Sequence, residues 1–150
     1  MTILAAIGEE DGSDEIIQTA ADLADAYEEP LSVVHVIPDS AFVAHKEAIE
    51  STPVGEGLSF SQEKDSAAEY ARRMTEESLE EIDYERVTAR GRVGDPATEV
   101  LAVIDNADPR FLIIGTRGRS PVGKAVFGST TQKLLLNATC PVVTVPVETP

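Results

Sequence analysis

One segment in the last third of the chain combines glycines and hydroxyl residues at a defined spacing. Gly115 and Gly118 enclose two residues, nine residues separate Gly118 from Gly128, and Ser-Thr-Thr follows at 129–131. Glycine lets backbone N–H groups approach a phosphate because no Cβ stands in the way. A concave run of such amides beside a helix N-terminus binds anions. The spacing therefore predicts a phosphate site; the alternative is that these glycines serve only a tight turn and close helix packing.

The charge distribution points to the same segment. The chain has 27 acidic and 12 basic residues and a net charge of −15, yet residues 109–147 contain no Asp or Glu. The basic residues in this stretch are Arg110, Arg117, Arg119, Lys124 and Lys133. An anion is repelled by the rest of such a surface, so this stretch is where we expect an anionic ligand.

Composition limits the classes of partner. A strongly acidic surface repels nucleic-acid phosphates and anionic lipid, which argues against nucleic-acid or membrane partners. No apolar run approaches the roughly 18 residues of a membrane span, the N-terminus lacks signal-peptide features, and Cys140 is the only cysteine. We therefore expect a cytoplasmic protein. The chain is rich in acidic residues and has only 4 lysines beside 8 arginines. This composition predicts adaptation to high salt, where screening weakens repulsion between the acidic residues; the alternative is an acidic mesophilic protein.

The elements that must position this segment alternate along the chain. Short apolar runs predict strands, and helical spacing, with Asp95 and Pro96 as cap and first residue of one helix, predicts helices between them. The expected strands are 3–7, 31–37, 84–89, 111–114 and 142–145, and the expected helices cover 13–27, 67–82, a segment from 96, and 123–137. This order predicts one α/β domain over residues 1–150, with a five-stranded parallel sheet, helices on both faces and a long variable loop at about 38–62.

The glycine segment leaves the fourth strand at the edge where parallel sheets bind ligands. Its spacing, G-x2-G-x9-G-[S/T], resembles the nucleotide-binding signature of the universal stress proteins. Residues 116–120 (TRGRS) are similar to that family's S-R-G-R-S loop, and residues 140–143 (CPVV) to the start of its last strand. Residues 94–97 (GDPA) and 35–36 (HV) extend the resemblance across nearly the whole chain.

The resemblance implies a Rossmann-like fold of the adenine-nucleotide alpha-hydrolase type, with strand order 3-2-1-4-5. It implies ATP as the ligand, with Mg²⁺ held mainly by the phosphates and no protein metal ligands. The positions carried over are Ala6, Ile7 and Val36 at the adenine, Ile114 and Gly115 at the floor, and Gly118, Gly128, Ser129, Thr130 and Thr131 around the phosphates. Gly8 and Thr116 are also counted among the nucleotide-binding positions. Arg117 and Arg119 are counter-charges in this interpretation, and solvated surface residues in the alternative.

One position departs from the family pattern. Members carry Asp-Gly-Ser directly after the first strand, whereas here Gly8-Glu9-Glu10 intervenes before Asp11. Either Gly8 occupies the Asp position or a longer loop folds Asp11 back. A third alternative is that Glu9 or Glu10 substitutes for the Asp, but two extra carboxylates near a triphosphate would oppose its binding. The departure concerns the residue that contacts the adenine or ribose, so it affects selectivity for these groups and leaves the phosphate segment intact.

A second phosphate motif overlaps the first. Residues 118–125 (GRSPVGKA) nearly match the P-loop pattern G-x4-G-K-[S/T], but Ala125 replaces the hydroxyl that holds Mg²⁺. We therefore reject a P-loop NTPase. His35, expected on a buried strand, is interpreted as a hydrogen-bonded core residue, and no catalytic set of His and Cys is recognised.

The leading hypothesis is an ATP-binding stress sensor or regulator. The alternatives are a nucleotide-free interaction protein acting through its dimer surface, and a slow ATPase. The last strand, Val142–Val145, is apolar and lies at the sheet edge in the family order. An apolar edge strand is a pairing surface, so we expect a homodimer through it.

Overall fold

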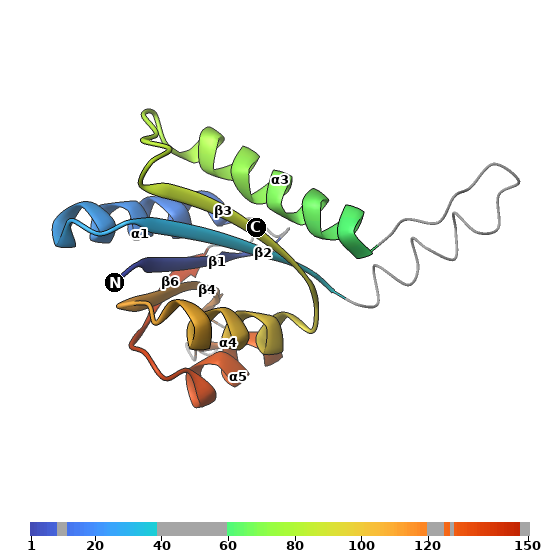
Figure 1. The fold of residues 1–150 in the computed structure, drawn as a ribbon. Helices are drawn as coiled ribbons and strands as arrows, with labels where there is room; N and C mark the ends of the chain where they lie inside the picture. The colour runs from blue at the N-terminus through green and yellow to red at the C-terminus, as the bar shows by residue number, and fades with distance from the viewer. Residues whose placement is uncertain (9–11, 39–59, 120–124, 127, 148–150) are drawn as a thin grey trace, which may run out of the picture.

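The structure is a computed structural model that describes residues 1–8, 12–38, 60–119, 125–126 and 128–147. Strands and helices alternate through most of this chain (Figure 1). The elements are β1 (Ile3–Ile7), α1 (Ser13–Tyr27), β2 (Leu31–Pro38), α3 (Phe60–Ser78), β3 (Val87–Gly94), α4 (Pro96–Ala107), β4 (Phe111–Arg119), β5 (Ala125–Val126), α5 (Ser129–Asn137) and β6 (Val142–Val147). None of the helices described here is long and apolar enough to cross a membrane.

The sheet has the predicted topology. Five strands run parallel in the order β3-β2-β1-β4-β6, and β5 adds a short antiparallel pairing to the end of β4. In the register, Ile3 lies beside both Leu31 of β2 and Phe111 of β4, and Leu112 lies beside Val142 of β6. The predicted order 3-2-1-4-5 is confirmed, with β6 as the fifth parallel strand.

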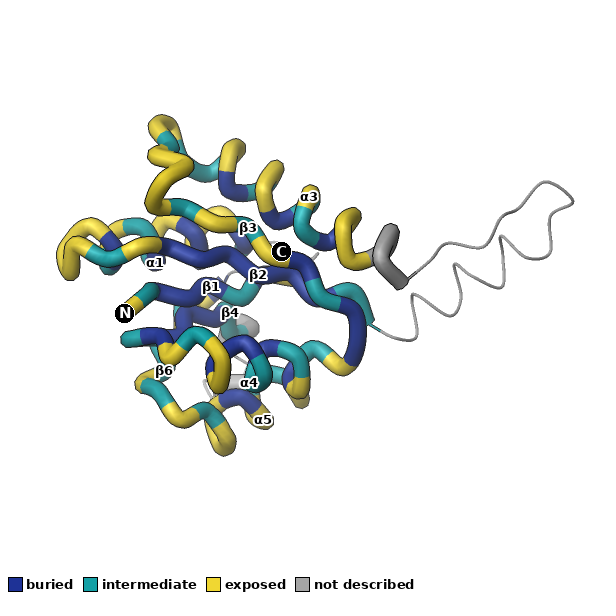
Figure 2. Tube along the Cα trace, viewed as in Figure 1, coloured by how far each residue is buried: buried dark blue, intermediate teal, exposed yellow. Residues whose placement is uncertain are grey.

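Two hydrophobic cores lie on opposite faces of the sheet (Figure 2). Because successive strand side chains point to opposite faces, Ile3, Ala5 and Ile7 of β1 enter the core under α1 and α3, whereas Leu4 enters the core under α4 and α5. All four residues are at most 6% exposed. Burial on both faces explains why these strands have continuous apolar sequences rather than alternating ones.

The third strand begins and ends later than predicted. The sequence analysis expected it at 84–89, but Tyr84 belongs to a turn in which the N–H groups of Arg86 and Val87 both donate to the Asp83 carbonyl. β3 then continues through Gly91, where a Cβ would collide with the backbone of α3 at Lys64 and Ala68. Glycine here allows helix and strand to pack closely, so it extends the strand rather than ending it.

Other boundaries also differ from the predictions. α3 begins at Phe60 rather than 67, so the predicted loop at 38–62 overlaps both β2 and α3, and residues 39–59 lie outside the described part. α3 ends at Ser78, not at 82. β4 continues through the glycine segment to Arg119 because 115–117 pair with 145–147 of β6. α5 begins at Ser129, six residues after the predicted start at 123.

Candidate functional site

A cavity of about 480 Å³ lies at the C-terminal ends of β1, β2 and β4. Eleven of the predicted residues line it: Ala6, Ile7, Gly8, Val36, Ile114, Gly115, Thr116, Gly128, Ser129, Thr130 and Thr131. Three loops that are distant in sequence meet here because the C-terminal ends of parallel strands lie at the same edge of the sheet. These eleven positions are thus neighbours in space, whereas Arg117, Gly118 and Arg119 are not among the lining residues.

The end of β1 is held by three side-chain hydrogen bonds. The Gly8 carbonyl accepts from Ser13 Oγ at 3.1 Å and from the Tyr70 hydroxyl at 3.3 Å. His35 Nδ1 lies 3.0 Å from the Ile7 carbonyl, and its ring centroid is 4.3 Å from that of Tyr70. His35 is 2% exposed, which confirms its interpretation as a hydrogen-bonded core residue.

Gly8 directly follows β1 and lines the cavity, and its carbonyl is occupied by protein donors. Residues 9–11, including Asp11, lie outside the described part of the chain. The structure therefore places Gly8 beside the cavity, at the position that directly follows β1.

The glycines around the cavity have different structural roles. Gly12 has φ +108°, and a Cβ there would collide with the side chain of Val147. At Gly115 a Cβ would lie 2.8 Å from Ile16 Cδ1 and 3.1 Å from Val147 Cγ2. Gly128 has φ −67° and ψ 166°, which any residue adopts, and a Cβ there meets nothing within 4 Å among the described atoms. Packing explains the first two glycines but not Gly128.

The N-terminus of α5 opens on the cavity. Its N-cap, Gly128, has no side chain to accept from the first-turn amides, and the first backbone bond of the helix runs from Gln132 N to the Gly128 carbonyl at 3.0 Å. The N–H groups of 129–131 precede that bond and have no acceptor within the helix. They carry the partial positive charge of the helix dipole, beside the hydroxyls of Ser129, Thr130 and Thr131.

The N-terminus of α4 also reaches the cavity, through Pro96. Its N-cap residue, Asp95, already accepts a hydrogen bond from a first-turn amide of this helix. Asp95 Oδ2 accepts from Thr98 N at 3.0 Å and from Thr98 Oγ1 at 2.8 Å. These bonds, side chain first and backbone second, lower the pKa of Asp95 from its ordinary value of 3.8, and the charge of Lys133 lowers it further.

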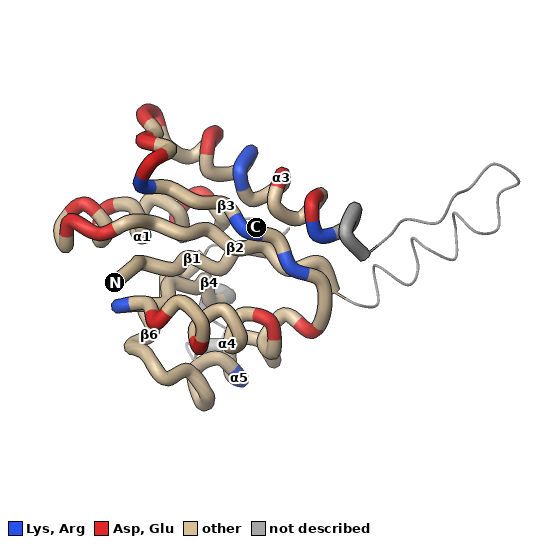
Figure 3. The backbone as a smooth tube through the Cα atoms, viewed as in Figure 1, with Lys and Arg blue, Asp and Glu red and all other residues tan. Residues whose placement is uncertain are grey.

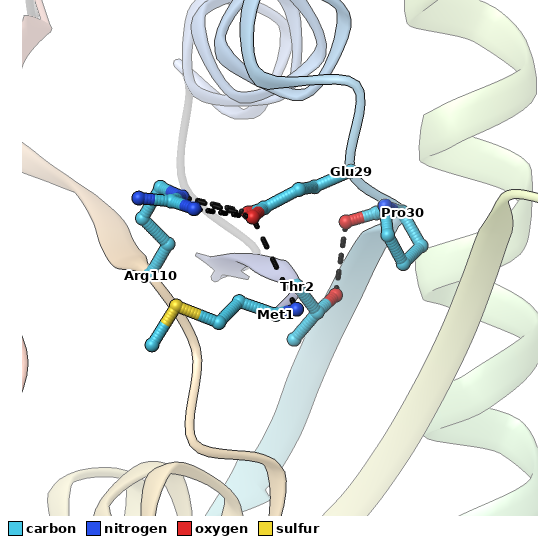
Figure 4. Close-up of polar contacts among 5 residues, drawn as sticks. All are labelled: Met1, Thr2, Glu29, Pro30 and Arg110. Carbon is cyan, nitrogen blue, oxygen red and sulfur yellow. Dashed lines mark hydrogen bonds and ion pairs between the residues drawn. The ribbon is translucent and has the colours of Figure 1, made fainter.

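The basic residues of the acid-free stretch do not form one group. Arg110 lies before β4 at the opposite end of the sheet, where Nε donates to both Glu29 carboxylate oxygens at 2.9 and 3.0 Å (Figure 4). This hydrogen bonding lowers the pKa of Glu29. The Arg110 guanidinium also lies 4.7 Å from the ring centroid of Tyr27. Its role in the fold is to join the start of β4 to the end of α1, so the acid-free stretch extends beyond the candidate site.

Arg117, Gly118 and Arg119 lie on the last part of β4. The side chains of the two arginines are outside the structural description, as is Lys124. Lys133 is exposed on α5. The predicted counter-charges therefore remain predictions.

The described lining contains no Asp, Glu, Lys or Arg. β1 and β2 contain no carboxylate, and the described Asp and Glu residues lie on the helices and in the turns that join the elements (Figure 3). In the described residues no group of three or more His, Cys, Asp and Glu is arranged to hold a metal ion. The arrangement can therefore accept an anion at α5 through amides and hydroxyls, beside an apolar wall that includes Val34, Val36 and Val100.

The sequence analysis missed several lining residues. These are Ser13, Ile16, Val34, His35, Pro38, Pro96, Val100, Leu134 and Val147. One signal could have found Pro96 and Val147: in a parallel sheet, the residues that follow β3 and end β6 reach the same edge as Gly115. The inward direction of Val34, Val100 and Leu134 depended on packing that no local pattern shows.

Residues 1–146 match the model of the universal stress protein family, and the chain belongs to this family. It is 25% identical over 138 residues to a universal stress protein of Methanocaldococcus jannaschii, covering 90% of this chain and 77% of that protein. A universal stress protein of Mycolicibacterium smegmatis is 47% identical over 57 residues, which are 37% of this chain and 44% of that relative.

Solved structures share the fold. A universal stress protein from Archaeoglobus fulgidus superposes with a TM-score of 0.61 at 25% identity, covering 96% of this chain and 97% of that one. The Archaeoglobus fulgidus protein solved in complex with dAMP gives 0.50 at 22% identity, covering 96% of both chains. A universal stress protein in complex with cAMP gives 0.58 at 14% identity, also covering 96% of both.

Proposed function

We propose that this protein binds ATP in the cavity at the C-terminal edge of the sheet and acts as a stress-response sensor or regulator through nucleotide occupancy. The observation that carries the proposal is Gly128. Neither its backbone conformation nor packing among the described residues requires glycine, and it precedes an uncapped helix N-terminus at the cavity wall. A phosphate is the group that such a position accepts.

The proposed pose follows from the two halves of the cavity. The phosphates lie at 128–131, where amides and hydroxyls converge, and the base lies on the apolar wall that contains Ala6 and Val36. Because the described lining contains no carboxylate, Mg²⁺ is held mainly by the phosphates. Family members solved with dAMP and cAMP support an adenine nucleotide as the ligand class.

The first test is extraction of nucleotide from freshly purified protein, followed by calorimetric titration of stripped protein with Mg-ATP. A buffer of about 2 M KCl matches the proposed high-salt adaptation. Saturable binding supports the proposal, and absence of binding at about 1 mM ATP contradicts it. Chromatography of the same samples over time separates binding from slow hydrolysis.

We also propose a homodimer through Val142–Val145 of β6. Among the described strands β6 pairs only with β4, so its outer edge is open, and Val142, Val143 and Val145 are only partly buried. Light scattering in high salt tests this proposal, and a monomeric mass contradicts it. A dimer without bound nucleotide would instead favour the interaction-protein alternative.

A further inference from the structure

A second groove lies at the other edge of the sheet, between α3 and β3, and has a volume of about 470 Å³. Ile82 and Tyr84 line its end, and residues 87–89 form its wall on β3. Its wall on α3 is formed by Asp65, Ala68, Glu69, Arg72, Thr75 and Glu76. The α3 residues recur at helical spacing and therefore share one face of the helix. This groove shares no lining residue with the cavity at α5.

The backbone of β3 borders this groove as an open edge. Among the described strands β3 pairs only with β2. Leu31 N donates to the Arg86 carbonyl at 2.8 Å, so in the parallel pattern Arg86 and Thr88 direct their backbone groups toward β2. The alternate residues Val87 and Ala89 then direct backbone groups away from the sheet, and both are partly exposed. The Val87 N–H donates to the Asp83 carbonyl, so the Val87 C=O and both backbone groups of Ala89 form the open part of this edge. Such groups accept an added strand.

Side chains on the two faces of this edge have opposite charge. On the α3 face the groove lining holds three carboxylates and one guanidinium, and Arg72 is already bound to Glu69 at 2.8 Å. On the other face Arg90 is exposed, and Arg92 is paired with Glu99 at 3.3 Å. An added strand would therefore present alternate residues to an acidic row and to Arg90.

The charge pattern selects the occupant. In a second copy paired antiparallel, with its α3 on the same side, β3 would place two acidic rows side by side, which like charges oppose. We propose that the groove between α3 and β3 binds an extended peptide segment of a partner protein, which adds to β3 and carries Lys or Arg at alternate positions facing α3. Backbone bonds to the Val87 carbonyl and to both backbone groups of Ala89 give affinity, and the carboxylates of Glu69 and Glu76 give specificity for basic side chains.

The test uses fluorescence anisotropy of two short labelled peptides of equal composition. In one, lysine alternates with threonine, and in the other the lysines are contiguous. The alternating peptide should bind at least about tenfold more tightly at low salt, and its binding should weaken in about 1 M KCl. Equal affinity for both peptides would mean non-specific attraction to an acidic protein and would overturn the proposal.

Two variants locate the site. Ala89→Pro removes an outward N–H without removing a bond to β2 and should abolish the preference for the alternating peptide.

The double change Glu69→Gln and Glu76→Gln should weaken binding about tenfold. The control Glu77→Gln changes an exposed α3 residue outside the groove lining and should affect binding little. Melting curves verify folding. If Ala89→Pro does not fold, the glutamine comparison decides, and equal effects at both places contradict the proposal.

Discussion

The helices α4 and α5 begin at the same edge of the sheet and line the same cavity, but their N-termini are built differently. Asp95 caps α4 with a carboxylate that accepts from Thr98, and Pro96 removes one amide donor from its first turn. Gly128 caps α5 without any side chain, and three hydroxyl residues follow it. One N-terminus is neutralised by the protein, and the other is open to a ligand.

The two caps have similar extended backbone conformations. Asp95 has φ −70° and ψ 121°, and Gly128 has φ −67° and ψ 166°. A carboxylate at 128 would therefore meet no conformational obstacle, and a Cβ there would meet no described atom. The lesson is that a helix N-terminus is no ligand site by itself, since a single cap residue can occupy its amides. Exchanging the chemistry of the two caps tests this comparison directly.

The largest expected effect comes from giving α5 the cap of α4. Gly128→Asp should weaken Mg-ATP binding at least about 100-fold, or about 2.7 kcal/mol, because the new carboxylate accepts from the first-turn amides and repels phosphate. Thermal stability should stay equal or rise, since Asp is a good N-cap. Titration calorimetry and thermal denaturation measure both quantities. Unchanged ATP affinity would mean that α5 is not the phosphate site.

A smaller effect is expected from adding only a methyl group. Gly128→Ala should weaken Mg-ATP binding about tenfold, or about 1.4 kcal/mol, because the Cβ keeps the phosphate from the backbone. The melting temperature should fall only slightly, since alanine is a poorer N-cap than glycine. The matched control is Gly115→Ala, whose Cβ meets Ile16 and Val147 and should lower the melting temperature. A loss of stability in Gly128→Ala as large as that in Gly115→Ala would indicate a packing role instead.

Removing the cap of α4 should have the opposite profile. Asp95→Ala should lower the melting temperature by a few degrees at neutral pH and leave ATP affinity within about threefold. The pKa of Asp95 is lower in the folded protein than its ordinary 3.8. Its contribution is therefore fully present above pH 3.8 and is lost as the pH falls through the lower folded value.

The melting temperatures of wild type and Asp95→Ala should accordingly converge in acid. Asp95→Asn, which caps without a titratable group, serves as the control whose advantage over alanine persists. A constant difference between wild type and Asp95→Ala across acid pH would show that the charge of Asp95 does not stabilise α4.

The smallest expected effect comes from removing the charge of Lys133 on α5, which acts on Asp95 at the N-terminus of α4. Lys133 on α5 lowers the pKa of Asp95 through its charge. Lys133→Gln should raise that pKa slightly, while the bonds from Thr98 keep it below 3.8. A carboxyl NMR titration measures the change. ATP affinity should fall far less than in Gly128→Asp, since Lys133 does not line the cavity; a comparable loss would assign phosphate binding to this charge.

Sequence reasoning could predict most of the fold because periodicity is a local property. The apolar runs at Ile3–Ile7 and 31–37 identified strands, and Asp95-Pro96 identified the start of α4. Boundaries failed where tertiary pairing overrode local signals. A glycine such as Gly115 is typical of a loop, but pairing with β6 keeps it in β4. Gly91 lies within β3 rather than at its end, because α3 packs directly over it.

Much of the candidate site could also be predicted, since motif spacing places Gly115 and Gly128 on consecutive elements that meet at one edge. Charge was a poorer guide. The acid-free stretch grouped Arg110 with the glycines. Arg110 precedes β4, however, whereas Gly115 and Gly118 lie in its middle and last part, and Arg110 bonds Glu29, which follows α1. Contiguity in sequence says nothing about which end of a strand a residue occupies.

The sequence by itself determined the alternation of strands and helices, the family, and the residue types available for an anion site, because these depend on composition and spacing along the chain. Only the tertiary structure decided which glycines are required by packing and which one has no described atom beside it. Gly12 and Gly128 are alike in sequence, but Val147 fills the space beside one and no described atom fills the space beside the other. The difference arises because a neighbour in space is set by strand register and helix packing, which join residues far apart in the chain.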